Sequence, residues 1–334
     1  MRQLSIFPEM GFANGRIAGT LGSEAPIIVS NGVGDDSIAM LIELHRLGVR
    51  PDAVVTAMVG RDWFGNEHRR FYEYLPIMEE WLALVSFPAP NYVWYEMKRE
   101  AKHFTYLSLA GNCLANRMLP SISYRRNHSC SIKYKGAEID RWVTAQYGER
   151  PCYRLVGYDL GEGYRNARFS TKAAPTGPRA NDVYIYPLQL LGMNRQACQQ
   201  SIIDADLPLP GKSSCVFCAS MKPEELDDLY PEELWIIVIL EANAAPKLQA
   251  IKGLWGHAGR MTDYIVMRGL LPGDLVQQVW EKWAAEERPP DLRDNPQAVA
   301  DEVLFAEVKR LAALTGVPVQ PEIATFFSKV ECEA

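Results

Sequence analysis

The segment from residue 25 to 59 constrains the fold most strongly, because two apolar strands there enclose one helix. Residues 25–30 are a short apolar run rich in β-branched side chains, and the next apolar residues recur at helical spacing from Ile38 to Leu47. Gly48 is placed to end that helix, and residues 51–59 form a second apolar strand. This order predicts a right-handed βαβ unit and therefore a parallel sheet of the α/β class.

The remaining apolar patterns extend this unit to a doubly wound parallel sheet that is followed by a helical region. Further elements are expected, in chain order, as a helix over 71–84, a strand over 92–97, a helix over 131–147, strands over 152–158 and 183–190, and helices over 274–287 and 298–314. From residue 222 onward the apolar spacing is helical throughout. We therefore expect an α/β domain that contains the cysteine motif over residues 1–221, and a helical C-terminal region over residues 222–334.

Composition limits the classes of protein to consider. A chain of 334 residues with 48% hydrophobic content can bury a large core. No run approaches the roughly 18 to 20 apolar residues that a membrane span needs, and no apolar signal core follows Met1, so a cytoplasmic location without membrane contact is expected. The formal charge of −6 argues against a protein that coats nucleic acid by electrostatic attraction alone.

A loop rich in small residues lies where the first strand gives way to the helix. Backbone N–H groups and the helix dipole converge on an anion at such a place, and glycines let the backbone approach a phosphate. An acidic residue there would repel phosphate unless Mg²⁺ lay between them, so Asp36 indicates a metal–nucleotide complex. The alternative is an ordinary strand–helix turn. The nucleotide-binding residues predicted here are Ser30, Asn31, Gly32, Val33, Gly34, Asp35, Asp36 and Ser37.

A pair of cysteines predicts a metal site. The two-residue spacer between Cys215 and Cys218 lets both thiolates bind one tetrahedral metal, and Cys130 would join them if its helix packs beside the carboxyl edge of the sheet. Three thiolates indicate either an iron–sulfur cluster with an open iron, or a fourth ligand from His128 or Cys113, with zinc as the alternative metal. A redox disulfide and inert buried thiols are the other interpretations of the pair.

Several of these segments together resemble one family. The loop is similar to the ATP pyrophosphatase loop of the adenine nucleotide alpha hydrolase superfamily, Ser-Gly-Gly-x-Asp-Ser, and more closely to the Ser-x-Gly-x-Gly-x-Asp-Ser variant of phosphoadenosine phosphosulfate reductase-like proteins. Asp35 stands where many relatives carry Lys. Other pieces follow in the family's order: Cys130 to Lys135, the Gly157, Glu162 and Arg165 pattern, Tyr186-Pro187-Leu188, and the Ser-x-Cys-x-x-Cys motif that ends at Cys218. The resemblance covers roughly residues 25–235.

The resemblance implies an ATP pyrophosphatase with the nucleotide-binding fold of that superfamily. It implies that Asp36, Ser37 and Lys133 are catalytic, that Gly157, Glu162 and Arg165 contact the nucleotide together with the loop, and that the cysteines hold the metal or cluster. Such relatives modify nucleic acids with sulfur, by DNA phosphorothioation in bacterial defence or by tRNA thiolation. A nucleic-acid acceptor and a sulfur donor such as a cysteine desulfurase are therefore the expected partners.

Two alternative functions stay open at the level of sequence. A phosphoadenosine phosphosulfate reductase would need a nucleophile in the tail, where Cys332 follows Glu331 but lacks the Gly and His of the reductase motif. A nucleotide-sensing partner subunit would bind ATP without turnover and use the helices after residue 222 to dock another protein.

Overall fold

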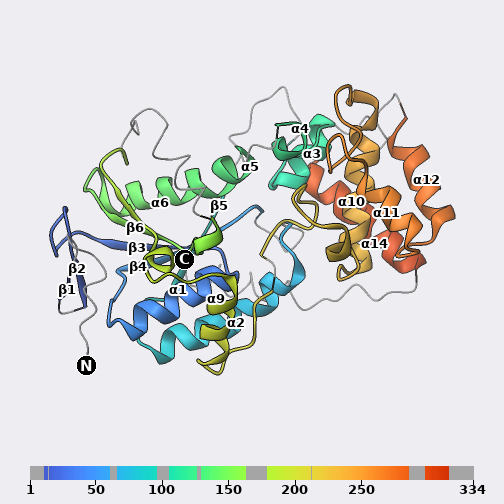
Figure 1. Cartoon of the computed structure of the whole chain (residues 1–334). Coiled ribbons are helices and arrows are strands. Elements are labelled where there is room, and N and C mark those ends of the chain that lie inside the picture. Colours follow the sequence, from blue (N-terminus) through green and yellow to red (C-terminus); the bar gives the residue numbers. More distant parts are fainter. Residues whose placement is uncertain are drawn as a thin grey trace. The chain divides into compact units, whose positions relative to one another are not determined.

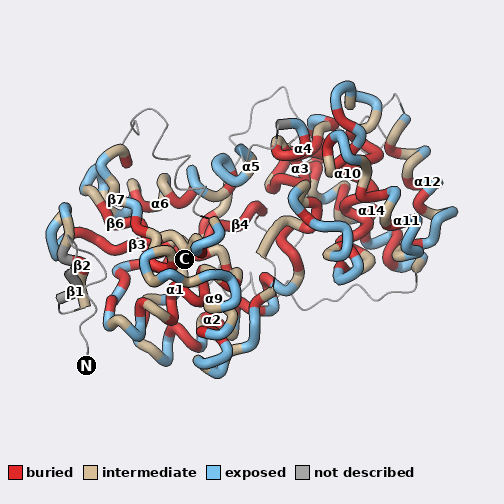
Figure 2. Tube along the Cα trace, viewed as in Figure 1, coloured by how far each residue is buried: buried red, intermediate tan, exposed pale blue. Residues whose placement is uncertain are grey.

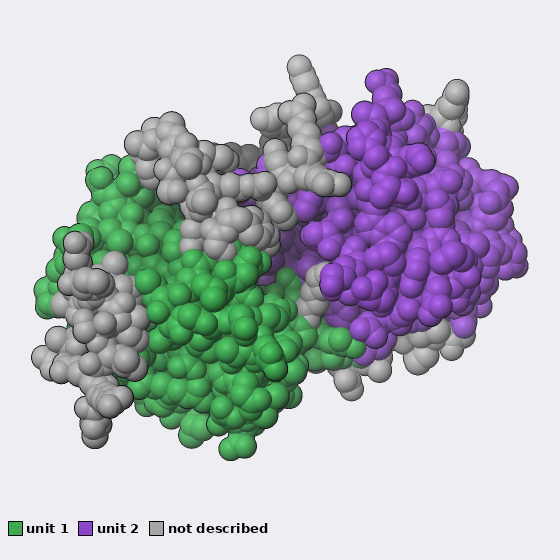
Figure 3. All heavy atoms as spheres, viewed as in Figure 1, with its two compact units in different colours: residues 1–57, 69–93, 136–213 green, residues 58–68, 94–135, 214–334 purple. Residues whose placement is uncertain are grey.

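The computed structural model describes residues 11–13, 15–60, 66–95, 105–125, 129–162, 179–211, 213–285 and 298–315. The chain divides into two compact units that alternate along the sequence (Figure 3). Unit 1 contains residues 1–57, 69–93 and 136–213, and unit 2 contains residues 58–68, 94–135 and 214–334. The sequence predicts one boundary after residue 221, whereas two earlier segments belong with the later helices because their apolar side chains share one core with them.

Unit 1 is built on a five-stranded, all-parallel sheet. Its strands lie in the order β5-β4-β3-β6-β7. They are β3 (Ile27–Asn31), β4 (Ala53–Met58), β5 (Pro90–Trp94), β6 (Tyr153–Val156) and β7 (Val183–Ile185). In this register Ser30 of β3 lies between Val55 of β4 and Val156 of β6. A separate antiparallel hairpin joins β1 (Gly11–Ala13) to β2 (Arg16–Ala18).

Helices flank this sheet (Figure 1). The helices α1 (Asp35–Arg46), α2 (Arg69–Leu84) and α9 (Arg195–Ile203) lie on one side, and α6 (Ala137–Tyr147) lies on the other. Ile139 and Val143 of α6 pack in one apolar cluster with Ile28 and Val55 of the sheet. Buried residues therefore dominate the central strands (Figure 2), as expected for a parallel sheet with covered faces.

The predicted βαβ unit is confirmed by β3, α1 and β4, but one other expectation needs correction. The strand expected over 183–190 ends at Ile185, because Pro187 lacks an N–H group and begins the short helix α8 (Pro187–Leu190). The helix expected over 131–147 is present, but it contains a π-helical turn at Ile132–Gly136 between α5 (Ser129–Ser131) and α6.

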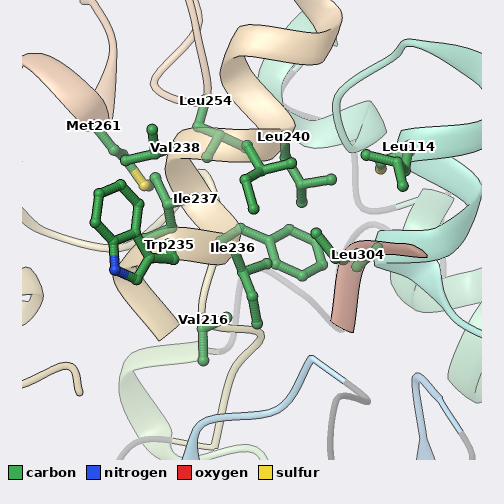
Figure 4. Close-up of a cluster of buried hydrophobic side chains, with 14 of the residues drawn as sticks. Leu114, Val216, Trp235, Ile236, Ile237, Val238, Leu240, Leu254, Met261 and Leu304 are labelled. Atoms are coloured by element: carbon green, nitrogen blue, oxygen red, sulfur yellow. The ribbon is translucent and has the colours of Figure 1, made fainter. Parts of the chain in front are cut away.

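Unit 2 is helical in its described residues and surrounds one central helix. Every side of α10 (Pro231–Ala244) is apolar or buried, so neighbouring helices cover it all round. Figure 4 shows Trp235, Ile236 and Leu240 of this helix among the buried side chains. The other helices are α3 (Leu109–Asn116), α4 (Ser121–Arg125), α11 (Met261–Met267), α12 (Gly273–Trp283) and α14 (Ala300–Leu314), with short 3₁₀ turns at Leu160–Glu162 in unit 1 and at Pro223–Leu226 and Ala245–Lys247 in unit 2.

Within the described part of the chain, no helix combines the length and the apolar character needed to cross a membrane.

Candidate functional site

The strand order of unit 1 places the loop after β3 at the point where the chain changes direction across the sheet. From β3 the chain adds β4 and β5 on one side, and it then returns to place β6 and β7 on the other. Open parallel sheets bind ligands outside the carboxyl ends of the strands at such a switch point. The segments that meet there are residues 32–34 after β3 and residues 157–162 after β6.

The Asn31 side chain fixes the shape of the loop after β3. Its side chain is only 3% exposed, its Nδ2 donates to Thr56 Oγ1 at 3.0 Å, and its Oδ1 accepts the backbone N–H of Val33 at 3.0 Å. Val33 itself has a φ of 55°, a left-handed conformation that a β-branched residue rarely adopts. The Asn31 side chain therefore supports the loop and holds this turn in place.

Ser37 closes the turn at the start of α1. Its hydroxyl donates to the Gly34 carbonyl and accepts the Gly34 N–H, both at 3.0 Å. Gly34 approaches Ser213 so closely that a Cβ there would lie 2.4 Å from the Ser213 hydroxyl oxygen. In this state the Ser37 hydroxyl acts as a helix cap, and a ligand would have to compete for it.

An arginine that the sequence analysis did not single out bridges both aspartates of the loop. Arg195 Nε lies 3.2 Å from Asp35 Oδ2, and its Nη1 donates to Asp36 Oδ2 at 3.0 Å. Gln199 adds a hydrogen bond to Asp35 Oδ2 at 2.8 Å. Because Arg195 is 159 residues from Asp36 in the chain, no local pattern could have revealed the pairing.

The second oxygen of each aspartate is buried without a hydrogen-bond donor. Asp35 Oδ1 and Asp36 Oδ1 both lack a partner among the described residues. Burial raises the pKa of Asp36, Arg195 opposes that shift, and the charges of Asp159 and Asp35 add to it. Buried acceptors without donors are rare in folded proteins, so these two oxygens are suited to a cation that the described chain does not itself supply.

Gly157 brings the end of β6 against the first turn of α1. A Cβ at Gly157 would lie 2.9 Å from the Asp36 carbonyl oxygen and 3.0 Å from Ser37 Cα. Asp159 is 6% exposed, and its Oδ1 accepts the Glu162 N–H at 2.9 Å. The structure thus brings Gly157 to the loop and ties Glu162 to Asp159, while the predicted ligand Arg165 lies outside the described residues.

The three predicted metal-binding cysteines all belong to unit 2. Residues 66–68 and 214–216 run antiparallel, with Glu67 opposite Cys215 and with backbone bonds from Val216 N to Asn66 O and from His68 N to Ser214 O. Cys218 N then donates to Cys215 O at 3.0 Å, which places the two cysteines on one tight turn.

A buried ion pair adjoins Cys215. The Glu67 side chain is fully buried, and Lys135 Nζ lies 2.7 Å from its Oε1. Burial raises the pKa of Cys215 well above its usual value; Glu67 adds to the shift, and Lys135 opposes it. Burial alone would lower the pKa of Lys135, but Glu67 and then the two thiols of the turn outweigh burial and raise it. Glu67 is a second residue that the sequence analysis did not identify.

Cys130 and Cys215 both pack against the apolar core of unit 2. The charges of Cys218 and Cys130 both add to the raised pKa of Cys215. Over the described residues, however, no three His, Cys, Asp or Glu side chains converge as metal ligands do. Of the suggested fourth ligands, Cys113 is fully buried with a pKa raised mainly by burial, and His128 lies outside the described residues, as does Cys332.

Lys133 lies over tyrosine rings of unit 2. Its Nζ is 4.7 Å from the ring centre of Tyr95, 5.0 Å from that of Tyr134 and 5.9 Å from that of Tyr106. These are cation–π distances. The π-helical turn that carries Lys133 also carries Lys135, and such turns recur at functional sites. Asp36 and Ser37 belong to unit 1, so the predicted catalytic set is divided between the two units.

The described residues form an α/β protein with an all-parallel sheet, and the loop after β3 brings Asp35, Asp36 and Arg195 together. Comparison of the sequence with models of protein families and with curated proteins gives no match.

Proposed function

We propose that this chain is an ATP pyrophosphatase that adenylates an acceptor for sulfur insertion, on a doubly wound fold like that of the adenine nucleotide alpha hydrolases. One observation carries the proposal. The loop that begins α1 lies at the switch point of the sheet and holds two aspartates, each with one buried oxygen that lacks a donor. A magnesium complex of ATP supplies what that loop lacks: a cation for the carboxylates and phosphates for the N–H groups at the start of α1.

The reaction divides into two displacements. An acceptor oxygen attacks the α phosphorus of ATP, the bond to the bridging oxygen breaks, and pyrophosphate leaves. Sulfur then displaces AMP, which carries the acceptor oxygen away. The loop backbone and Ser37 would hold the leaving pyrophosphate, and Asp36 would hold the Mg²⁺ that accompanies ATP, whose charge would offset the negative charge that develops on the pyrophosphate.

The cysteines of unit 2 are assigned to the sulfur step. Cys130, Cys215 and Cys218 are the residues that would hold an iron–sulfur cluster or, alternatively, zinc. Such a cluster, if one iron lacked a protein ligand, would supply a place for sulfide. We expect a nucleic acid as the acceptor, a cysteine desulfurase as the sulfur donor, and the cytoplasm as the compartment in which thiols stay reduced.

Loss of the loop aspartate tests the nucleotide step. Asp36→Ala and Ser37→Ala should abolish the conversion of ATP to AMP and pyrophosphate, because one removes the Mg²⁺ ligand and the other removes a phosphate donor. Circular dichroism should show an unchanged fold, since Asp36 is not part of the apolar core. Unchanged turnover in both variants would remove the phosphate-loop assignment, and a wild-type chain that binds ATP without releasing pyrophosphate would instead favour a sensing subunit.

Cysteine variants test the metal assignment. The anaerobically purified protein should be brown, and the colour should be lost in Cys215→Ser and in Cys218→Ser. Cys130→Ser should lose both metal and sulfur transfer but keep nucleotide binding, whereas Cys332→Ser should keep near-normal sulfur transfer. A colourless protein with one bound zinc would favour a structural site, and a dead Cys332→Ser beside an active Cys130→Ser would favour the reductase.

A further inference from the structure

Arg195 is the basic side chain that contacts both aspartates of the loop. It is the first residue of α9, and it reaches the first turn of α1 through its Nε and Nη1 atoms. The loop from residue 30 to 37 contains no Lys or Arg of its own. The positive charge that the described structure brings into contact with the loop carboxylates therefore comes from α9.

The guanidinium group retains donors for a ligand. An arginine has five N–H donors in a planar fork, and Nε and Nη1 of Arg195 face the two carboxylates. Within the described residues, Nη2 makes no hydrogen bond or ion pair, and the side chain as a whole is 51% exposed. Nη2 thus keeps donors for a ligand, while Nε and Nη1 are held by the two carboxylates.

Charge balance requires such a cation when a nucleotide binds. Asp35 is 2% exposed and Asp36 is mostly buried, so phosphates placed at the start of α1 would lie beside two carboxylates. One Mg²⁺ offsets part of this charge, and the phosphates of ATP still carry more negative charge than the metal neutralises. A guanidinium that is already oriented by the carboxylates can bind a phosphate oxygen without losing further side-chain entropy.

We infer that Arg195 is a phosphate-binding residue of the nucleotide site, held by Asp35 and Asp36 through its Nε and Nη1 and bonded to the pyrophosphate moiety of ATP through its Nη2. The inference rests on the proposed function. It assigns Asp35 the role of positioning Arg195, and it explains how an acidic loop without a lysine binds an anion.

Binding measurements with inorganic pyrophosphate and with MgATP test this role by calorimetry on the full chain. Arg195→Gln should weaken both affinities about tenfold to a hundredfold, since one charge-assisted hydrogen bond is lost. Arg195→Lys should retain part of the affinity because it keeps the charge without the fork. Arg46→Ala is the matched control. Arg46 Nη1 donates to Ser201 Oγ at 2.9 Å and so joins α1 to α9, but Arg46 does not contact the loop. The affinity of this variant for pyrophosphate and for MgATP should equal that of the wild type.

A double variant separates phosphate binding from support of the fold. Arg195→Gln leaves Asp35 buried without its cation, and Asp35→Asn in the same chain removes that charge. The double variant should regain thermal stability but not affinity. Recovered affinity in the double variant would show that Arg195 only neutralises Asp35, which would overturn the inference. Unchanged affinity in the single variant Arg195→Gln would also overturn it, but would leave the proposed ATP pyrophosphatase function intact. A wild-type chain that binds neither ligand would overturn the proposed function as well.

Discussion

At the scale of single residues, two side chains fix the backbone of the loop after β3. Asn31 turns its amide into the protein and bonds Thr56 and Val33, so the loop keeps its shape without a ligand. Ser37 bonds both polar groups of the Gly34 backbone. These bonds order the loop before any ligand binds, which lowers the entropy cost of binding one there.

Gly157 is the residue whose replacement should disturb the site most selectively. Gly157→Ala would bring a methyl group within 2.9 Å of the Asp36 carbonyl oxygen, and backbone there cannot move aside as a flexible side chain can. We expect a loss of about 1 to 3 kcal/mol in unfolding free energy, together with weaker ATP binding.

Gly136→Ala is the control for this change, because a Cβ at Gly136 meets open space on a helical backbone. It should be neutral or slightly stabilising, as the more restricted unfolded chain loses less entropy on folding. Chemical denaturation measures the unfolding free energy of both variants, and titration with ATP measures their affinity. Equal values for the two variants would show that the end of β6 does not lie against the loop.

At the scale of elements, Glu307 links α12 to α14 through three cationic contacts. Its Oε2 accepts from Arg310 Nε at 2.9 Å, its Oε1 accepts from Arg310 Nη2 at 3.0 Å, and Lys282 Nζ lies 3.2 Å from Oε1. Burial alone would raise the pKa of Glu307, but the bonds from Arg310 and the charge of Lys282 outweigh burial and lower it below its ordinary value of 4.5.

This lowered pKa predicts a dependence of stability on pH. A carboxyl group whose pKa is lower in the folded state stabilises the fold above its unfolded value of 4.5 and loses that contribution as the pH falls through the folded value. Glu307→Gln should therefore cost about 1 to 2 kcal/mol at pH 7 and progressively less below pH 4.5. Denaturation of the wild type and of Glu307→Gln at pH 7 and at a pH below 4.5 measures this difference. A pH-independent difference for Glu307→Gln would contradict the ion-pair account.

At the scale of the whole molecule, the core of unit 2 draws on segments far apart in the chain. Leu109, Cys113 and Leu114 of α3 are buried in the same cluster as α10 and α14. Residues 222–334 alone would thus expose the surfaces of α10 and α14 that α3 covers.

That arrangement predicts the behaviour of the C-terminal fragment. Residues 222–334 expressed alone should unfold without a cooperative transition and should bind a hydrophobic dye, because the exposed apolar surface of α10 loses its covering. The intact chain under the same conditions should show a sharp transition and little dye binding. A sharp thermal transition in the fragment would mean that the helical region folds without α3.

Local patterns were sufficient for β3, α1 and β4, since each of these elements depends on the period of its own apolar residues. They also located the loop between β3 and α1, because the glycines and polar residues of residues 30–37 interrupt two regular patterns. Local patterns failed at residues 183–190, where the backbone chemistry of Pro187 outweighed an apolar run, and they gave no sign of the π-helical turn at Ile132–Gly136.

The sequence by itself determined the class of the fold and the position of the loop between β3 and α1, because periodicity and glycine placement act over a few residues. Only the tertiary structure decided that Arg195 joins Asp35 and Asp36, that Gly157 touches the loop, and that Glu67 lies opposite Cys215. Those contacts arise from the order of strands in the sheet and from the pairing of distant segments. The free energy that selects such an arrangement is the burial of the whole core, which no local stretch of sequence contains.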